Sequence, residues 1–147
     1  MDTISKQKRS ENMAAIKSFN TKPEIAVKSV LRRMKLRYKF NLKKMPGKPD
    51  FYLTKNNLVI FVNGCFWHQH KSTKCVYVAK PKSNKLFWKT KLEQNVVRDK
   101  KNKAVLKHLG YNVLTLWECE IGKKSNSKES FTKIENKIKK SIKIEKI

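Results

Sequence analysis

Acidic residues are scarce in this chain. Of its 147 residues only 11 are Asp or Glu, against 36 Lys and Arg, so the formal net charge at pH 7 is +25. A charge of this size favours a polyanionic partner, and nucleic acid is the usual one for such a balance. A basic protein of membrane surfaces is the alternative, but it would need a lipid-modification signal or a long amphipathic stripe.

Long apolar runs and a secretory signal are also missing. No apolar run approaches the roughly 20 residues of a membrane span, and the first twelve residues, MDTISKQKRSEN, have no apolar core. We therefore expect a cytoplasmic protein that makes no use of a membrane. With 39% hydrophobic residues the chain can bury one modest core, and its length fits a single domain over residues 1–147.

Arginine and cysteine are few as well. Only five of the basic residues are Arg, and Lys is a point charge that suits phosphate better than the bidentate reading of guanine. Most of the charge is therefore expected to hold a nucleic-acid backbone. The three cysteines, Cys65, Cys75 and Cys119, are an odd number. This argues against a disulfide framework in a cytosolic chain and leaves metal binding or simple burial.

The hydrophobic pattern predicts an α/β domain around a small mixed sheet flanked by helices. Thr21-Lys22-Pro23-Glu24 has the pattern of a helix N-terminus, and apolar residues follow it at helical spacing. The further elements expected are strands over 50–53 and 58–62, a helix from Ser83 to about Leu109, and a strand over 113–117. The short turn between the first two strands favours an antiparallel hairpin.

Two basic segments flank this expected core of residues 21–121. Residues 1–20 are polar and basic apart from a few residues such as Met13, and are expected to form an N-terminal arm. Residues 122–147 contain nine Lys, with apolar residues at helical spacing, namely Phe131, Ile134, Ile138 and Ile142. This C-terminal tail is predicted to be a basic amphipathic helix, or one that frays in isolation.

Because acids are so few, each carboxylate can be weighed separately. Asp50 follows a Pro-Gly-Lys-Pro loop and opens an apolar strand. A carboxylate in that position can hold Mg²⁺, which takes one or two protein carboxylates together with water and phosphate oxygens. The alternative is a turn-capping Asp. Glu24 can reach the same place from the first helix, but its place in a capping box is already a sufficient explanation.

The segment 63–75 holds an unusual concentration of His and Cys. With Cys119, it offers four residues that suit a tetrahedral structural zinc site: Cys65, His70, Cys75 and Cys119. Burial of Cys119 as a small hydrophobic residue is the alternative. His68 is left over, and a free His near a carboxylate can transfer protons. The adjacent Phe66 and Trp67 are candidates either for wedges between DNA bases or for the edge of the core.

Several segments together resemble the very-short-patch repair (Vsr) endonucleases. The resemblance runs from about Lys8 to Glu120 and rests on motifs that occur in one order. These motifs are Arg9-Ser10-Glu11-Asn12-Met13, Pro46-Gly47-Lys48-Pro49-Asp50-Phe51, Gly64-Cys65-Phe66-Trp67-His68, Asn95-Val96-Val97-Arg98-Asp99 and Trp117-Glu118-Cys119. The resemblance implies a restriction-endonuclease-like core with a structural zinc, and an enzyme that uses Mg²⁺ to nick one strand of double-stranded DNA. The nick lies 5′ to the T of a T:G mismatch, which arises when 5-methylcytosine deaminates.

The resemblance also implies roles for individual residues. Asp50 matches the carboxylate that binds the metal, and Val62 matches the residue that offers it a backbone carbonyl. Glu24 and His68 match residues that order metal-bound water. Met13, Phe66 and Trp67 match the wedge beside the mismatch, and Cys65, His70, Cys75 and Cys119 match the zinc ligands. A monomer is expected, with functional links to a DNA cytosine methyltransferase and to mismatch-repair proteins.

Two departures from the best-known members concern the site itself. Asn63 stands where those members have a His before Gly-Cys-Phe-Trp-His, and Asn can orient water or phosphate but cannot exchange a proton near neutral pH. His70 and Cys75 are further apart than in those members. Two other functions stay open: a zinc-stapled DNA- or RNA-binding protein without catalysis, and a restriction or junction nuclease of the same fold.

Overall fold

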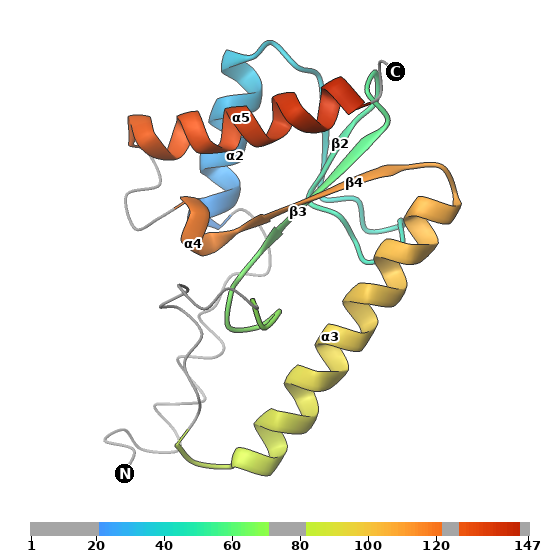
Figure 1. The fold of residues 1–147 in the computed structure, drawn as a ribbon, viewed down its shortest axis with the longest axis vertical. Helices are drawn as coiled ribbons and strands as arrows, with labels where there is room; N and C mark the ends of the chain where they lie inside the picture. The colour runs from blue at the N-terminus through green and yellow to red at the C-terminus, as the bar shows by residue number, and fades with distance from the viewer. Residues whose placement is uncertain (1–20, 71–81, 122–126, 145–147) are drawn as a thin grey trace.

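A mixed four-stranded sheet lies at the centre of the computed structural model, which describes residues 21–70, 82–121 and 127–144 (Figure 1). The elements in chain order are α2 (Lys22–Arg33), β1 (Lys39–Phe40), β2 (Phe51–Leu53), β3 (Leu58–Asn63), α3 (Lys85–His108), β4 (Asn112–Trp117), α4 (Glu118–Ile121) and α5 (Lys128–Ile144). The α/β class and the small mixed sheet flanked by helices are thus as predicted. In these ranges no helix is both long and apolar enough to cross a membrane.

The sheet has the order β1-β2-β3-β4. β2 and β3 form the predicted antiparallel hairpin, with Phe51 opposite Ile60. β4 then returns through α3 to lie parallel to β3, with Asn63 opposite Trp117 at the end of the ladder. This parallel crossover brings the ends of β3 and β4 to the same edge of the sheet, next to residues 64–70 and α4.

The central strand β3 is buried on both faces, which its unbroken apolar sequence explains. Leu58 and Ile60 belong to a core cluster with α2 and α5, whereas Val59 and Phe61 pack with Leu106 of α3. Successive side chains of a strand point to opposite faces, so one strand serves both cores. Helices therefore cover both faces of the sheet.

Helices α2 and α5 share the larger core. The apolar face predicted for α2 is buried there through Val27, Val30 and Leu31. Ile134 and Ile138 of α5 are buried in the same cluster, with Phe131 and Ile142 packed beside them. The apolar residues at helical spacing in the tail thus lie on one face of α5, and this face packs on the domain.

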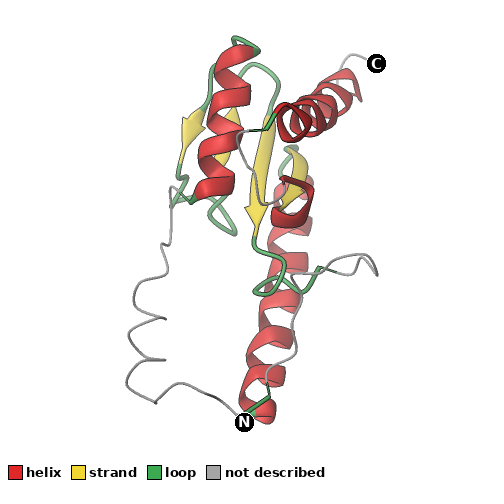
Figure 2. Ribbon diagram, turned by 90° about the vertical axis from the view of Figure 1, so that its left-hand side faces the viewer, coloured by secondary structure: helices red, strands yellow, loops and turns green. Residues whose placement is uncertain are grey.

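Helix α3 is 24 residues long and passes well beyond the edge of the sheet (Figures 1 and 2). Its C-terminal part packs on the sheet through Leu106, while Leu86, Phe87 and Val97 in its N-terminal and central parts are exposed. The expected start at Ser83 was wrong: Asn84 is the N-cap, in the left-handed conformation, and its side chain forms no capping hydrogen bond. β1 and α4 were not predicted, because two or four residues carry too little periodicity to be recognised.

Candidate active site

The loop before β2 fixes Asp50 at the edge where β3 ends. Gly47 has a φ of +74°, and a side chain there would meet the ring of Phe61 and Cβ of Asn102, so the loop can pass this close only with glycine. The Asp50 N–H donates to the Ile60 carbonyl at 3.0 Å, and the Asp50 carbonyl accepts from Asn41 at 2.9 Å. The backbone of Asp50 is therefore held on both sides.

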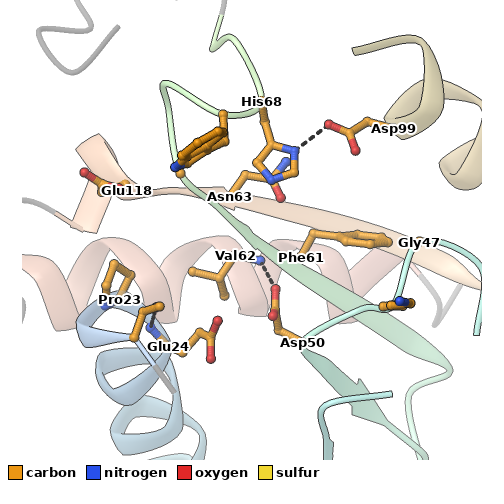
Figure 3. A pocket seen from close by; sticks show the side chains of 14 residues that line it. Pro23, Glu24, Gly47, Asp50, Phe61, Val62, Asn63, His68, Asp99 and Glu118 are labelled. Atoms are coloured by element: carbon orange, nitrogen blue, oxygen red, sulfur yellow. Dashed lines mark hydrogen bonds and ion pairs between the residues drawn. The ribbon is translucent and has the colours of Figure 1, made fainter. Parts of the chain in front are cut away.

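The side chain of Asp50 faces two neighbours. Its Oδ2 accepts a hydrogen bond of 2.6 Å from the Val62 backbone N–H, and its other neighbour is the buried carboxylate of Glu24 (Figure 3). Thr21 Oγ1 accepts from the Glu24 N–H at 3.5 Å, so the threonine half of the predicted capping box is present. The carboxylate of Glu24 lies beside Asp50, so two acidic side chains meet in a partly desolvated place at the start of α2.

The surroundings of Asp50 strongly raise its pKa. Burial raises the pKa of Asp50 from 3.8 to about 7, the Val62 N–H hydrogen bond opposes the rise, and the charge and hydrogen bond of Glu24 add to it. A pair of close carboxylates in a partly desolvated place favours a shared proton. A divalent cation would relieve the same repulsion, and oxygen ligands of this kind suit Mg²⁺.

His68 stands on the other side of the site, in a compact turn after β3. The turn is closed by backbone hydrogen bonds from His68 to Gly64 and from His70 to Cys65, at 3.1 and 3.0 Å. His68 Nδ1 lies 2.5 Å from Oδ2 of Asp99 on α3 (Figure 3). When one ring nitrogen bonds to a carboxylate, the tautomer and the ring orientation are fixed, and the other nitrogen is left for chemistry.

These groups line one cavity of about 370 Å³. Asn63, the last residue of β3 and only 4% exposed, lies in its wall together with Val62. The charged and polar residues around the cavity include carboxylates from four elements or loops and a single lysine: Glu24, Asp50, Asp99, Glu118 and Lys48. In a chain of charge +25 this concentration of acids is a marked local exception, and it favours cations.

A second group of ligands lies beside the turn. Cys65 Sγ, His70 Nδ1 and Cys119 Sγ lie within 4.8 Å of one another. The His70 nitrogen is 3.8 Å from Cys65 Sγ and 3.2 Å from Cys119 Sγ, and the His70 ring stacks on Trp117 with centroids 4.2 Å apart. Such distances separate donors around one tetrahedral zinc, since Zn–S is about 2.3 Å and Zn–N about 2.0 Å. Cys75, the fourth predicted ligand, lies outside the described residues, as does Met13.

Phe66 and Trp67 are half-buried and belong to neither core cluster. They contact each other and Trp88 of α3, with ring centroids 5.3 to 5.7 Å apart. The Trp67 carbonyl also accepts a hydrogen bond from Asn95 at 3.2 Å. α3 thus supports the pair of aromatic side chains from behind.

The sequence analysis predicted five residues of a catalytic site, and the structure places all of them around one cavity: Glu24, Asp50, Val62, Asn63 and His68. It missed Asp99 and Glu118 as lining residues, although both stand in motifs of the resemblance. The scarcity of acids is a signal that could have identified Asp99. No spacing rule links it to His68, because 31 residues and most of α3 separate the two.

Comparisons with known proteins identify the family of this chain. A family model described as DNA mismatch endonuclease Vsr matches residues 1–74. The type II nicking enzyme V.NmeAIP of Neisseria meningitidis serogroup A is 38% identical over 141 residues, which are 96% of this chain and 99% of that relative. The DNA mismatch endonuclease Vsr of Escherichia coli K12 is 36% identical over 132 residues, covering 89% of this chain and 83% of that relative.

The type II nicking enzyme V.XorIIP of Xanthomonas oryzae is 38% identical over 120 residues, or 82% of this chain and 86% of that relative. Two of these relatives are named nicking enzymes and one a DNA mismatch endonuclease, and this chain is a DNA endonuclease. More narrowly, it belongs to the DNA mismatch endonuclease Vsr family. The predicted resemblance is thereby confirmed.

Proposed function

We propose that this endonuclease uses Mg²⁺ to nick one strand of duplex DNA 5′ to the T of a T:G mismatch, and so starts very-short-patch repair of deaminated 5-methylcytosine. Membership of a family named for mismatch cleavage supports the substrate. The observation that carries the mechanism is the cavity in which Asp50, with its raised pKa, faces Glu24 on one side and the His68–Asp99 pair on the other.

The Asp50 end of the cavity is the proposed magnesium site. Asp50 supplies a carboxylate ligand, Glu24 orders the surrounding water, and Val62 offers its backbone carbonyl. The donor set fits a hard cation, because two carboxylates that repel each other lie near the C-terminal end of β3, with backbone oxygen nearby. When bound, Mg²⁺ would polarise the scissile phosphate, lower the pKa of water and stabilise the leaving oxygen.

The protein's own groups then handle water and protons. Asp99 accepts from Nδ1 of His68, so Nε2 of the same ring is available to exchange a proton with a water or with the leaving oxygen. The amide of Asn63 can donate to a water or a phosphate oxygen, but it cannot take up a proton. Proton transfer therefore falls to His68, and Asn63 has an orienting role.

Two further assignments concern structure and recognition. Cys65, His70 and Cys119, with Cys75, hold a structural zinc that closes the turn bearing His68, within a restriction-endonuclease-like core. Phe66 and Trp67, with Met13 of the arm, enter the DNA beside the mismatch. A wobble pair is cheaper to unstack than a matched pair, so wedges select it.

The test compares three DNA substrates under single-turnover conditions with Mg²⁺. Duplexes that differ only in T:G or C:G at one position are incubated with the full chain, and a four-way junction serves as the third substrate. We expect one nick, 5′ to the T, in the T:G duplex alone. Asp50→Asn should abolish it and leave DNA affinity within a few-fold, because affinity comes from many Lys contacts. Equal cutting of the matched duplex or of the junction would instead indicate a restriction or junction nuclease, and binding without any cut a non-catalytic protein.

A further inference from the structure

A second cavity of about 370 Å³, called the rear cavity below, adjoins the candidate active site at the His68–Asp99 pair. His68 and Asp99 line both this cavity and the candidate active site, so the pair forms a wall between two adjoining hollows. The charges behind the wall differ from those in front. Lys100 and Lys103 of α3 line the rear cavity, and Asp99 is its one acid among the described residues.

Lys103 is the unusual member of this group. It lies one helical turn after Asp99 and is half-buried, with its ammonium group 5.8 Å from the centroid of the Phe61 ring. Burial lowers the pKa of Lys103, the charge of Lys107 lowers it further, and the charge of Asp99 opposes both. In the described part of the chain no carboxylate lies within 4.0 Å of the ammonium group.

A partly desolvated cation without an ion pair leaves a favourable place for an anion. Asp99 does not fill this need, since it pairs with His68 and forms no ion pair with Lys103 within 4.0 Å. The apolar wall of the rear cavity, which includes Val96 and Trp117, reduces the screening of any charge that enters. The rear cavity is therefore suited to one compact anion, such as a backbone phosphate.

We propose that the rear cavity is a binding subsite for a backbone phosphate of the DNA, one that neighbours the scissile phosphate, with Lys103 as its cation. Lysine is a point charge that serves phosphate without reading bases. The subsite deepens the proposed function, because it places the cut strand across the His68–Asp99 wall. The scissile phosphate lies on the acidic side, where it needs a metal ion, and its neighbour lies on the basic side, where it does not.

Binding experiments without added Mg²⁺ test this subsite, since the DNA then stays uncut. The affinity for a T:G duplex is measured by fluorescence anisotropy over a range of salt concentrations. Lys103→Met keeps the stem over Phe61 and removes the charge; we expect roughly fivefold weaker binding at low salt and a salt slope smaller by about 0.9. Lys103→Arg should stay near wild type. Lys101→Met is the matched control, because Lys101 is exposed on the same helix and lines neither cavity.

The location of the phosphate is tested by neutralising single linkages. Duplexes that carry one methylphosphonate, at each position in turn around the scissile bond, are bound to wild type and to Lys103→Met. We expect the loss caused by Lys103→Met to disappear at one linkage next to the scissile one and to persist at all others. If no linkage removes the loss, or if Lys101→Met causes an equal loss, then Lys103 acts only through the general positive field and the subsite is wrong.

This outcome is independent of the nicking assay. If the protein nicks the T:G duplex but no methylphosphonate position abolishes the effect of Lys103→Met, the subsite is refuted and the proposed function stands. If one methylphosphonate position abolishes the effect of Lys103→Met but the protein never nicks with Mg²⁺, the proposed function is refuted. The rear cavity is then a phosphate site in a DNA-binding protein.

Discussion

The raised pKa of Asp50 predicts how the stability of the folded protein depends on pH. In the unfolded chain Asp50 ionises near pH 3.8, whereas in the folded, metal-free protein its pKa is about 7. The folded state therefore holds the proton more tightly between these values, so this group's contribution to stability is greatest at low pH and is lost as the pH rises through 7. Asp50→Asn removes this dependence and keeps an oxygen that accepts from the Val62 N–H.

The expected size follows from the pKa values. Between pH 5 and pH 7 the two states differ over about two pH units, which corresponds to at most about 3 kcal/mol at about 1.4 kcal/mol per unit. Asp50 keeps some contact with solvent, which screens its charge, so about 1.5 kcal/mol is a realistic figure. For a chain of this length that is a change in Tm of roughly 3 to 6 °C.

The assay is thermal unfolding at pH 5 and at pH 8, without added Mg²⁺ and without a chelator, which would remove the zinc proposed at Cys65, His70 and Cys119. Relative to Asp50→Asn, the wild type should lose roughly 3 to 6 °C between the two pH values. Mg²⁺ should restore much of that loss at pH 8, because the proposed site would bind it only when the chain is folded and the site is ionised. Glu93→Gln, which removes an exposed acid from α3, should behave as wild type. If wild type and Asp50→Asn show the same pH dependence, the Asp50–Glu24 pair does not hold a proton and the reasoning fails.

Three further predictions concern the remaining assignments. Elemental analysis should find one zinc per chain, and Cys119→Ala should lose it and unfold at lower temperature, because structural zinc contributes to the free energy of folding; well-folded wild type without zinc would exclude the ligand set. Ala at both Phe66 and Trp67 should erase the preference for T:G over matched DNA more than it weakens total binding; unchanged discrimination would assign both rings to packing. His68→Ala should slow nicking by on the order of 10² or more, and Asn63→Ala roughly fivefold to tenfold. The order is checked by single-turnover rates, and a larger loss at Asn63 would reverse the two roles.

The sequence by itself determined those features that local patterns record. The unbroken apolar run that buries β3 on both faces, the apolar faces of α2 and α5, and the hairpin of β2 and β3 all follow from patterns within a few residues. The motifs around Asp50 and His68 identified the family, because several short patterns in one order are specific even where each is weak. The net charge of +25 indicated a polyanionic partner without any knowledge of the fold.

Only the tertiary structure decided how these segments meet. The parallel crossover of β4 brings Cys119 to Cys65 and His70, and α3 brings Asp99 to His68. The sequence grouped Cys119 with Cys65 and His70 by residue type alone. Neither contact is encoded in spacing, because each depends on how a long helix packs on the sheet. The raised pKa of Asp50 and the lowered pKa of Lys103 have the same origin. Both are effects of desolvation and of neighbouring charges, which exist only once distant residues have been packed around the group.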